Sequence, residues 1–279
     1  MIKNRAEVKY RNLWPKIVNR IWSLFIPKPA GIKKFPAYIP LGHGVICPIV
    51  SENYWNSFRE IFRDHAYGDI LDRVGVVDTW IDIGSHCGFF SLNLILNRKL
   101  KKQADKISAL LIDADERVKR SIDMMVKCNK LEDNVTFVHG AIASVPDVKF
   151  YERDEMASSA LIVEGMRQST KKVKTVSEKD IIRLLPPPYD LLKIDIEGSE
   201  YDFLKDYPAV LAKTKLLILE WHSWNPKAPG GKKDILKMAI DQGFEMLLDS
   251  PEKSLIVNGK PATRGVCLLK NTALDKNHL

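Results

Sequence analysis

The stretch that decides the fold is Tyr189–Leu204, YDLLKIDIEGSEYDFL. It begins with the apolar side chains of a buried strand, namely Leu191, Leu192, Ile194 and Ile196. Two carboxylates, Asp195 and Glu197, stand at the end of that strand. Burying an unpaired carboxylate is costly, so this ending indicates that the acids lie at the rim of the core, where a polar ligand binds.

Strands and helices alternate on both sides of this stretch, from about Val76 onward. The apolar patterns predict strands over 76–84, 107–113, 134–143, 148–153, 215–222, 244–248 and 265–270. They predict helices over 89–97, 118–129, 176–185 (with Ser177 as its cap), 199–212 and 232–242. Residues 156–172 are polar and are expected to form a loop. The alternation predicts an α/β protein with a mostly parallel, doubly wound sheet in one domain.

Composition and charge narrow the class of protein. The 279 residues are 45% hydrophobic and 28% charged, as in ordinary soluble proteins. Residues 1–34 contain nine basic side chains and one acid, which accounts for the whole net charge of +8. A neutral body argues against a nucleic-acid-binding core. The four cysteines are far apart without a CxxC pair, which favours reduced thiols in a cytoplasmic setting over a disulfide framework or zinc knuckle.

The N-terminal segment, residues 1–40, is basic and amphipathic and precedes a domain over 41–279. Its apolar run is too short to span a bilayer, which takes about 20 residues, and it lacks a secretory cleavage site. One interpretation is a helix packed on the domain or on a second copy in a homodimer. The other is a helix on an anionic membrane surface, which gives peripheral contact through residues 1–28.

Acids end four of the predicted strands. They are Asp82, Asp113, Asp195 and, with His222 beside it, Glu220. Ligands of open parallel sheets bind at the carboxyl ends of the strands. The first of these strands runs into the glycine loop DIGSHCGFF, residues 82–90, which is neither GxGxxG nor a P-loop. Asp113 suits a ribose diol, because one carboxylate accepts from both hydroxyls; the alternative is a cap on the next helix.

These motifs together resemble the FkbM-type methyltransferases. The resemblance rests on WIDIGSHCGFFSL, Asp113, NVTFVHGAIAS, YDLLKIDIEGSEYDFL and LLILEWH, which span about Val76 to Leu248. It departs from the family at His86, where an Asn is usual, and at Asp113-Ala114, where Glu-Pro is usual. The resemblance implies a Rossmann-like class I methyltransferase fold with an antiparallel C-terminal strand, and S-adenosylmethionine as cofactor.

By the same resemblance the cofactor contacts fall on the strand ends and on the segment that borders the adenine. The candidates are Asp82, Gly84, Ser85, His86, Gly88, Phe89, Asp113, Ala114, Gly140, Ala141 and Asp195. Asp195 is expected to face the methyl group.

Methyl transfer to a hydroxyl needs an aligned acceptor and a group that takes its proton. The candidate bases are Asp195, Glu197, Glu220 and His222, and the alternative for His222 is a hydrogen-bonded histidine beneath the site. A second route follows catechol O-methyltransferase-like enzymes, in which acids at two neighbouring strand ends hold Mg²⁺. Asp195 and Glu220 occupy comparable places, so they are the alternative metal ligands; the favoured interpretation is a site without a metal ion.

The resemblance implies O-methylation of a sugar, glycan or related metabolite, and the basic tail suggests an acceptor on a lipid carrier. Trp221, Trp224 and the segment after them are candidates for an acceptor wall. His43, Tyr67 and the segment FRDHAYGD, residues 62–69, are expected to close over the cofactor from the other side. An NAD(P)-dependent oxidoreductase and a catalytically silent cofactor-binding subunit are the alternatives. No nucleic-acid partner is expected.

Overall fold

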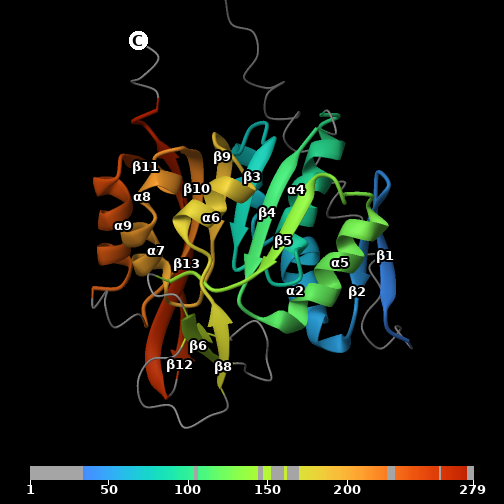
Figure 1. Ribbon diagram of the computed structural model, residues 1–279, viewed down its shortest axis with the longest axis horizontal. Coiled ribbons are helices and arrows are strands. Elements are labelled where there is room, and N and C mark those ends of the chain that lie inside the picture. Colours follow the sequence, from blue (N-terminus) through green and yellow to red (C-terminus); the bar gives the residue numbers. More distant parts are fainter. Residues whose placement is uncertain are drawn as a thin grey trace, which may run out of the picture.

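The computed structural model describes residues 34–103, 106–143, 147–151, 160–161, 170–224, 230–257 and 259–274. Its centre is an eight-stranded sheet with the order β11-β13-β10-β9-β3-β4-β5 and with β12 paired to β13 (Figure 1). The strands are β3 Thr79–Ile83, β4 Ser108–Asp113, β5 Val135–His139, β9 Tyr189–Ile194, β10 Thr214–His222, β11 Phe244–Asp249, β12 Lys253–Val257 and β13 Lys260–Asn271.

Strands β5, β4, β3, β9 and β10 are parallel, and β13 enters antiparallel between β10 and β11. The predicted doubly wound sheet with an antiparallel C-terminal strand is therefore confirmed. The register also sets the site, because Ile83 pairs with both Ile112 and Ile194. The residues that follow these three, Gly84, Asp113 and Asp195, consequently lie at the same level of the sheet edge.

Two hydrophobic cores fill the two faces of the sheet. One face is covered by α4 Phe89–Leu100 and α5 Lys119–Cys128, and the hairpin of β1 Ala37–Gly42 and β2 Val45–Ile49 packs on them. The other is covered by α6 Glu178–Leu184, α7 Glu200–Asp206, α8 Pro208–Leu211 and α9 Lys232–Asp241. In Figure 1 the second group lies on the left and α4 and α5 lie on the right.

Short helical turns complete the layer that contains α4, α5 and the β1–β2 hairpin. They are η2 Glu52–Tyr54, α2 Trp55–Phe58, η3 Arg59–Arg63 (a π-helix), α3 Gly68–Arg73 and η4 Glu116–Val118. Among the described residues no helix combines the length and the apolarity needed to cross a bilayer. All four cysteines are free thiols.

One helix differs from the sequence-based expectation. The helix predicted over 199–212 is two helices, because Pro208 begins α8 and cannot continue α7. Arg98, in the last turn of α4, is buried and pairs with Asp78 at 2.6 Å. The cap at Ser177 is confirmed and forms a capping box with Asp180.

A second, three-stranded sheet has the order β7-β6-β8. Its strands are β6 Asp147–Tyr151, β7 Ala160–Leu161 and β8 Thr170–Lys174, so the loop predicted over 156–172 contains β7 and the start of β8. An isolated bridge between Ala141 and Thr175 joins it to the segment after β5. At the N-terminus, β1 spans the predicted boundary at residue 40. Residues 1–33, with the predicted amphipathic helix, lie outside the described residues.

Candidate functional site

A cleft opens along the carboxyl ends of β4, β3, β9 and β10. The sequence predicts acids at these strand ends. Its lining includes the glycine loop from Gly84 to Cys87, the strand ends at Asp113 and Asp195, and the segment Gly140 to Ile142. Ala114, Phe89 and Glu197 also line it, and Glu220 lies at its far end. Most of the predicted cofactor and catalytic residues are thus gathered in one cavity.

The glycine loop is held against its neighbours by backbone contacts. The amides of Gly84 and Ser85 both donate to the Ile112 carbonyl, at 2.9 and 3.1 Å. Gly84 has φ +71°, and a Cβ there would lie 1.6 Å from the carbonyl oxygen of Asp195. Only glycine therefore permits the loop to meet the end of β9. Gly88 has a different role, since it begins α4 and packs on Met125 without lining the cleft.

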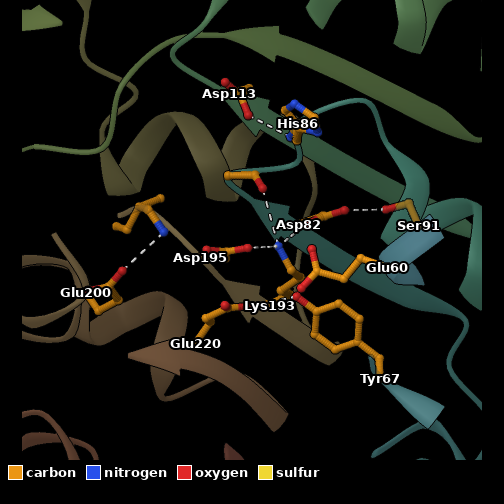
Figure 2. A network of polar contacts seen from close by, with 12 residues as sticks. Glu60, Tyr67, Asp82, His86, Ser91, Asp113, Lys193, Asp195, Glu200 and Glu220 are labelled. Carbon is orange, nitrogen blue, oxygen red and sulfur yellow. Dashed lines mark hydrogen bonds and ion pairs between the residues drawn. The ribbon is translucent and has the colours of Figure 1, made fainter. Parts of the chain in front are cut away.

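Asp113 connects the second strand to this loop. Its Oδ2 accepts from the backbone amide of His86 at 2.7 Å, and its Oδ1 accepts from that of Asp115 at 2.8 Å (Figure 2). Burial raises the pKa of Asp113 to about 6. The helical turn that follows is capped by Asp115, which accepts from the Arg117 amide. Asp113 therefore keeps lone pairs toward the cleft, as a ribose ligand requires.

The His86 side chain is a neutral wall of the cleft. Its ring lies 5.7 Å from that of Tyr54, and its Nδ1 is 2.9 Å from the Cys87 sulfur. Burial lowers the pKa of His86 to about 4, so the ring carries no charge near neutral pH.

Lys193 is a site residue that sequence reasoning missed. Its ammonium lies 3.2 Å from Asp195, 3.5 Å from Asp82 and 3.3 Å from the Gly84 carbonyl, and Figure 2 shows it among these groups. Burial lowers the pKa of Lys193, but the two aspartates outweigh burial and raise it. For Asp195, burial raises the pKa, but the cations around it, Lys193 first and then His222 and Arg264, together outweigh burial and leave the pKa below its usual value. Both groups are therefore charged.

Asp82 supports the site from below. It is fully buried, accepts from the Ser91 hydroxyl at 2.8 Å, and does not line the cleft. Ser91 is in turn fixed by the Trp80 indole at 3.0 Å. Asp82 was predicted to contact the cofactor; the structure instead places it below the loop, which it reaches through Lys193.

Glu197 projects into the cleft just beyond Asp195. Its backbone has φ +53°, an uncommon conformation for a residue other than glycine, and its carbonyl accepts from the Trp224 indole at 3.0 Å. Burial raises the pKa of Glu197 to about 8. The strained backbone is thus held by its surroundings at a functional position.

His222 lies behind the cleft wall. It is fully buried, and its Nδ1 is 2.7 Å from Glu200. Burial lowers the pKa of His222, but the carboxylates around it, Glu200 first and then Glu197 and Asp195, together outweigh burial and raise it to about 10. Because an imidazolium cannot accept a proton, the geometry favours the alternative of a hydrogen-bonded histidine beneath the site. One ring nitrogen of His222 lies close enough to Asp195 and Glu220 for the three to share a cation.

The far end of the cleft is strongly polar. Glu220 accepts from the Tyr67 hydroxyl at 3.0 Å and pairs with Arg264 at 3.0 Å, and Arg264 is 3.7 Å from Glu60. Figure 2 shows Glu60, Tyr67 and Glu220 close together. Tyr67 was among the predicted residues; Glu60 and Arg264 were missed. Arg264 is opposite His222 in the antiparallel register, which no local pattern reveals.

The predicted aromatic wall does not line the cleft. Trp221 is fully buried in the core, and Trp224 packs on Gly198 and His222 behind the Glu197 turn. His43 is exposed in the turn between β1 and β2. Residues 225–229, which belong to the predicted wall, lie outside the described residues.

Comparisons with known proteins identify a family and one relative with a similar sequence. Residues 82–246, more than half of the chain, match the family model for the methyltransferase FkbM domain. A protein of Jannaschia sp. (strain CCS1) named "Putative methyltransferase" is 32% identical over 90 residues. That alignment spans 31% of this chain and 30% of the relative, less than a third of the relative's length.

Two solved structures are similar at low identity. A precorrin-6y C5,15-methyltransferase from Geobacter metallireducens is 12% identical, with 75% of this chain and 87% of that chain covered and a TM-score of 0.43. TrmK of M. capricolum, in complex with S-adenosyl-homocysteine, is 10% identical, with 74% and 68% covered and a TM-score of 0.42.

Proposed function

This chain belongs to the methyltransferase FkbM family, and from that premise we propose that it is an S-adenosylmethionine-dependent methyltransferase. One observation carries the proposal: the loop at Gly84, the carboxylate of Asp113 and the carboxylate of Asp195 line a single cleft at the strand ends. A glycine loop that allows close approach, an acceptor for a ribose and an anion for a cationic donor are the parts that this cofactor needs.

The residues present fit the cofactor. Asp113 would hold the ribose, and Asp195, which stays ionised beside Lys193, would attract the positively charged methionine end. Ala141, Ile142 and Phe150 give the cleft an apolar wall suited to an adenine. When bound, the cofactor supplies a methyl group already activated on a sulfonium.

The chain's own task is then to orient the acceptor and to take a proton from it. Glu197 is the residue we assign as general base, because its carboxyl lines the cleft next to Asp195 and its backbone is fixed by Trp224. Because burial raises the pKa of Glu197 to about 8, the ionised form predominates above that pH, and there the proton passes from the acceptor hydroxyl to a Glu197 carboxylate oxygen. Asp195 is a weaker candidate, since its ion pair with Lys193 stabilises the unprotonated form.

The acceptor we propose is a hydroxyl of a sugar, glycan or related metabolite. Glu60, Tyr67, Glu220 and Arg264 supply carboxylate, hydroxyl and guanidinium groups at the far end of the cleft, which suits a molecule rich in hydroxyls. The basic residues near the N-terminus support two further proposals: an acceptor on a lipid carrier, and contact of residues 1–28 with a membrane surface. A homodimer through the same segment is the other arrangement.

The alternative dinucleotide oxidoreductase has less support, because the loop DIGSHCG is not GxGxxG. The experiment is a labelled-methyl transfer screen of the full chain against sugar nucleotides, lipid-linked glycans and small hydroxylated metabolites. Glu197→Gln serves as the inactive control. Label transferred by the wild-type chain and not by the variant supports the proposal. If neither transfers label to any class, and the chain binds NAD instead, the oxidoreductase alternative replaces it.

A further inference from the structure

We propose that Asp195, Glu220 and His222 bind one divalent transition-metal ion between the cofactor end and the acceptor end of the cleft. Each side chain offers one ligand atom, and the three atoms lie within 4.8 Å of one another. The role of the ion in catalysis rests on the proposed function, whereas the binding of the ion does not.

The decisive feature is a buried nitrogen without a partner. His222 is fully buried, and its Nδ1 is engaged by Glu200 at 2.7 Å. Its Nε2 has no hydrogen-bond partner among the described residues. A buried polar atom left unpaired costs free energy, so this nitrogen favours a partner that the described side chains do not supply. Since Nδ1 is occupied, Nε2 is the nitrogen that would bind the ion.

Glu200 holds this histidine in the orientation that a ligand needs. Metal-binding histidines usually give their second ring N–H to a carboxylate, which fixes the ring and raises its basicity. The Glu200 Oε1 also accepts from the amides of Ile196 and Gly198, at 3.2 and 3.0 Å (the first is drawn in Figure 2). One carboxylate thus ties His222 to the turn that follows Asp195, which sets two of the three ligands relative to each other.

The two carboxylates keep room for an ion. Asp195 contacts Lys193 through Oδ2, at 3.2 Å. Glu220 contacts Arg264 through Oε1 and Tyr67 through Oε2, each at 3.0 Å. A carboxylate has about four lone-pair sites, so each retains free ones. With Glu197 and Glu200 also near His222, carboxylates outnumber Lys193 and Arg264 around it. An added cation is favoured there.

The donor set selects the kind of ion. Two carboxylate oxygens would also suit Mg²⁺, but an imidazole nitrogen suits Zn²⁺, Fe²⁺, Co²⁺ and similar ions better. The ion would replace the proton on His222 Nε2. Three protein ligands leave coordination positions open, so an acceptor oxygen can bind and lose its proton more easily.

The test is a titration of the full-length chain, freed of metal by chelation, with Co²⁺ followed by its visible absorption. We expect one ion per chain. His222→Gln should weaken binding by at least about 100-fold, and Glu200→Gln, which keeps a hydrogen bond without the charge, by about 10–100-fold. His43→Asn is the matched control, because His43 is exposed at φ +52°, a conformation that Asn tolerates, and should bind as the wild type does.

Absence of saturable binding, or equal affinity in His222→Gln and the wild type, would overturn the inference. If His222→Gln does not fold, as judged by circular dichroism, Glu220→Gln takes its place with the same expected loss. Calorimetry of the metal-free chain with S-adenosylhomocysteine separates the two proposals. Binding of that ligand without binding of Co²⁺ removes the ion alone, and failure to bind S-adenosylhomocysteine counts against the methyltransferase.

Discussion

Lys193 shows at the scale of one residue how the site is assembled. It is buried between two aspartates, of which Asp82 is fully buried and Asp195 faces the cleft. A buried ion pair adds little net stability, but removing one partner leaves a charge without compensation. Lys193 therefore orders Asp195, the anion that we propose meets the cofactor.

Replacing Lys193 by Met should destabilise the protein by roughly 3–5 kcal/mol, because Asp82 loses the cation beside it. Chemical denaturation measures the change. The matched control is Lys215→Met, since Lys215 is largely exposed and pairs with Asp190 at 2.7 Å, and it should cost less than about 1 kcal/mol. Equal losses in both variants would show that Lys193 is not a structural cation.

Asp113 gives a pH dependence whose sign follows from its pKa. Burial raises that pKa to about 6, so the carboxylate is ionised above pH 6 and protonated below it. A protonated carboxyl loses acceptor capacity for a ribose, so affinity for S-adenosylhomocysteine should fall as the pH decreases, by about tenfold one pH unit below the pKa. Calorimetry between pH 7.5 and 5 measures this. A flat profile in the wild type would remove Asp113 from the cofactor site.

The role of Glu197 as general base is tested by replacing its carboxyl group with the amide of Gln. Glu197→Gln keeps the size of the side chain and removes the proton acceptor, so kcat should fall by about 10²–10⁴-fold while affinity for S-adenosylhomocysteine changes little. The comparison uses the acceptor found by the methyl-transfer screen. A variant that retains full kcat would assign the proton to another group.

The sequence predicts the site residues that lie at strand ends, but not those whose role depends on a partner in another strand. Acids at the ends of parallel strands are predictable, because these ends share one edge of a sheet, and Asp113, Asp195 and Glu220 do line one cleft. Lys193 was missed because one cation inside an apolar run carries no sign of its partner on another strand. Arg264 was missed because it depends on the register of β13.

At the scale of elements, the loop between β3 and α4 has no room for a side chain at Gly84. Gly84 and Gly44 both have positive φ, +71° and +77°, but only Gly84 lacks space for a Cβ. Gly44→Ala should cost about 1–2 kcal/mol from its backbone alone. Gly84→Ala should cost about 1–3 kcal/mol more, because the Asp195 carbonyl must move, and should impair cofactor binding. Thermal unfolding of the pair checks this, and equal costs would refute the close contact.

The elements themselves were mostly predictable, since the apolar periodicity of the main-sheet strands and of α4, α5, α6 and α9 is strong. The exceptions have local causes. Pro208 divides one predicted helix in two. β7 and the start of β8 lie in a polar stretch without an alternating apolar pattern, so the sequence does not reveal that these strands pair with β6. The hairpin β1–β2 lies before the region where the alternation begins.

At the scale of the molecule, the sequence places its net positive charge in residues 1–34 and leaves the rest neutral, and we propose a separate role for the basic segment. If residues 1–28 bind an anionic surface, their removal should reduce partitioning to vesicles rich in phosphatidylserine, by about 1 kcal/mol for each basic side chain that reaches the surface. Vesicles of phosphatidylcholine are the control and should bind neither form. Unchanged partitioning of the shortened chain would leave packing on the domain or on a second copy.

The most direct measurement of the central claim is a calorimetric titration of the full chain, wild type and Asp113→Asn, with S-adenosylhomocysteine and with NAD. The account predicts binding of S-adenosylhomocysteine to the wild type, about 10–100-fold weaker binding to the variant, and no binding of NAD. Asp123→Asn, an exposed substitution on α5, should match the wild type. A chain that binds NAD and not S-adenosylhomocysteine, or a variant that binds as tightly as the wild type, would contradict it.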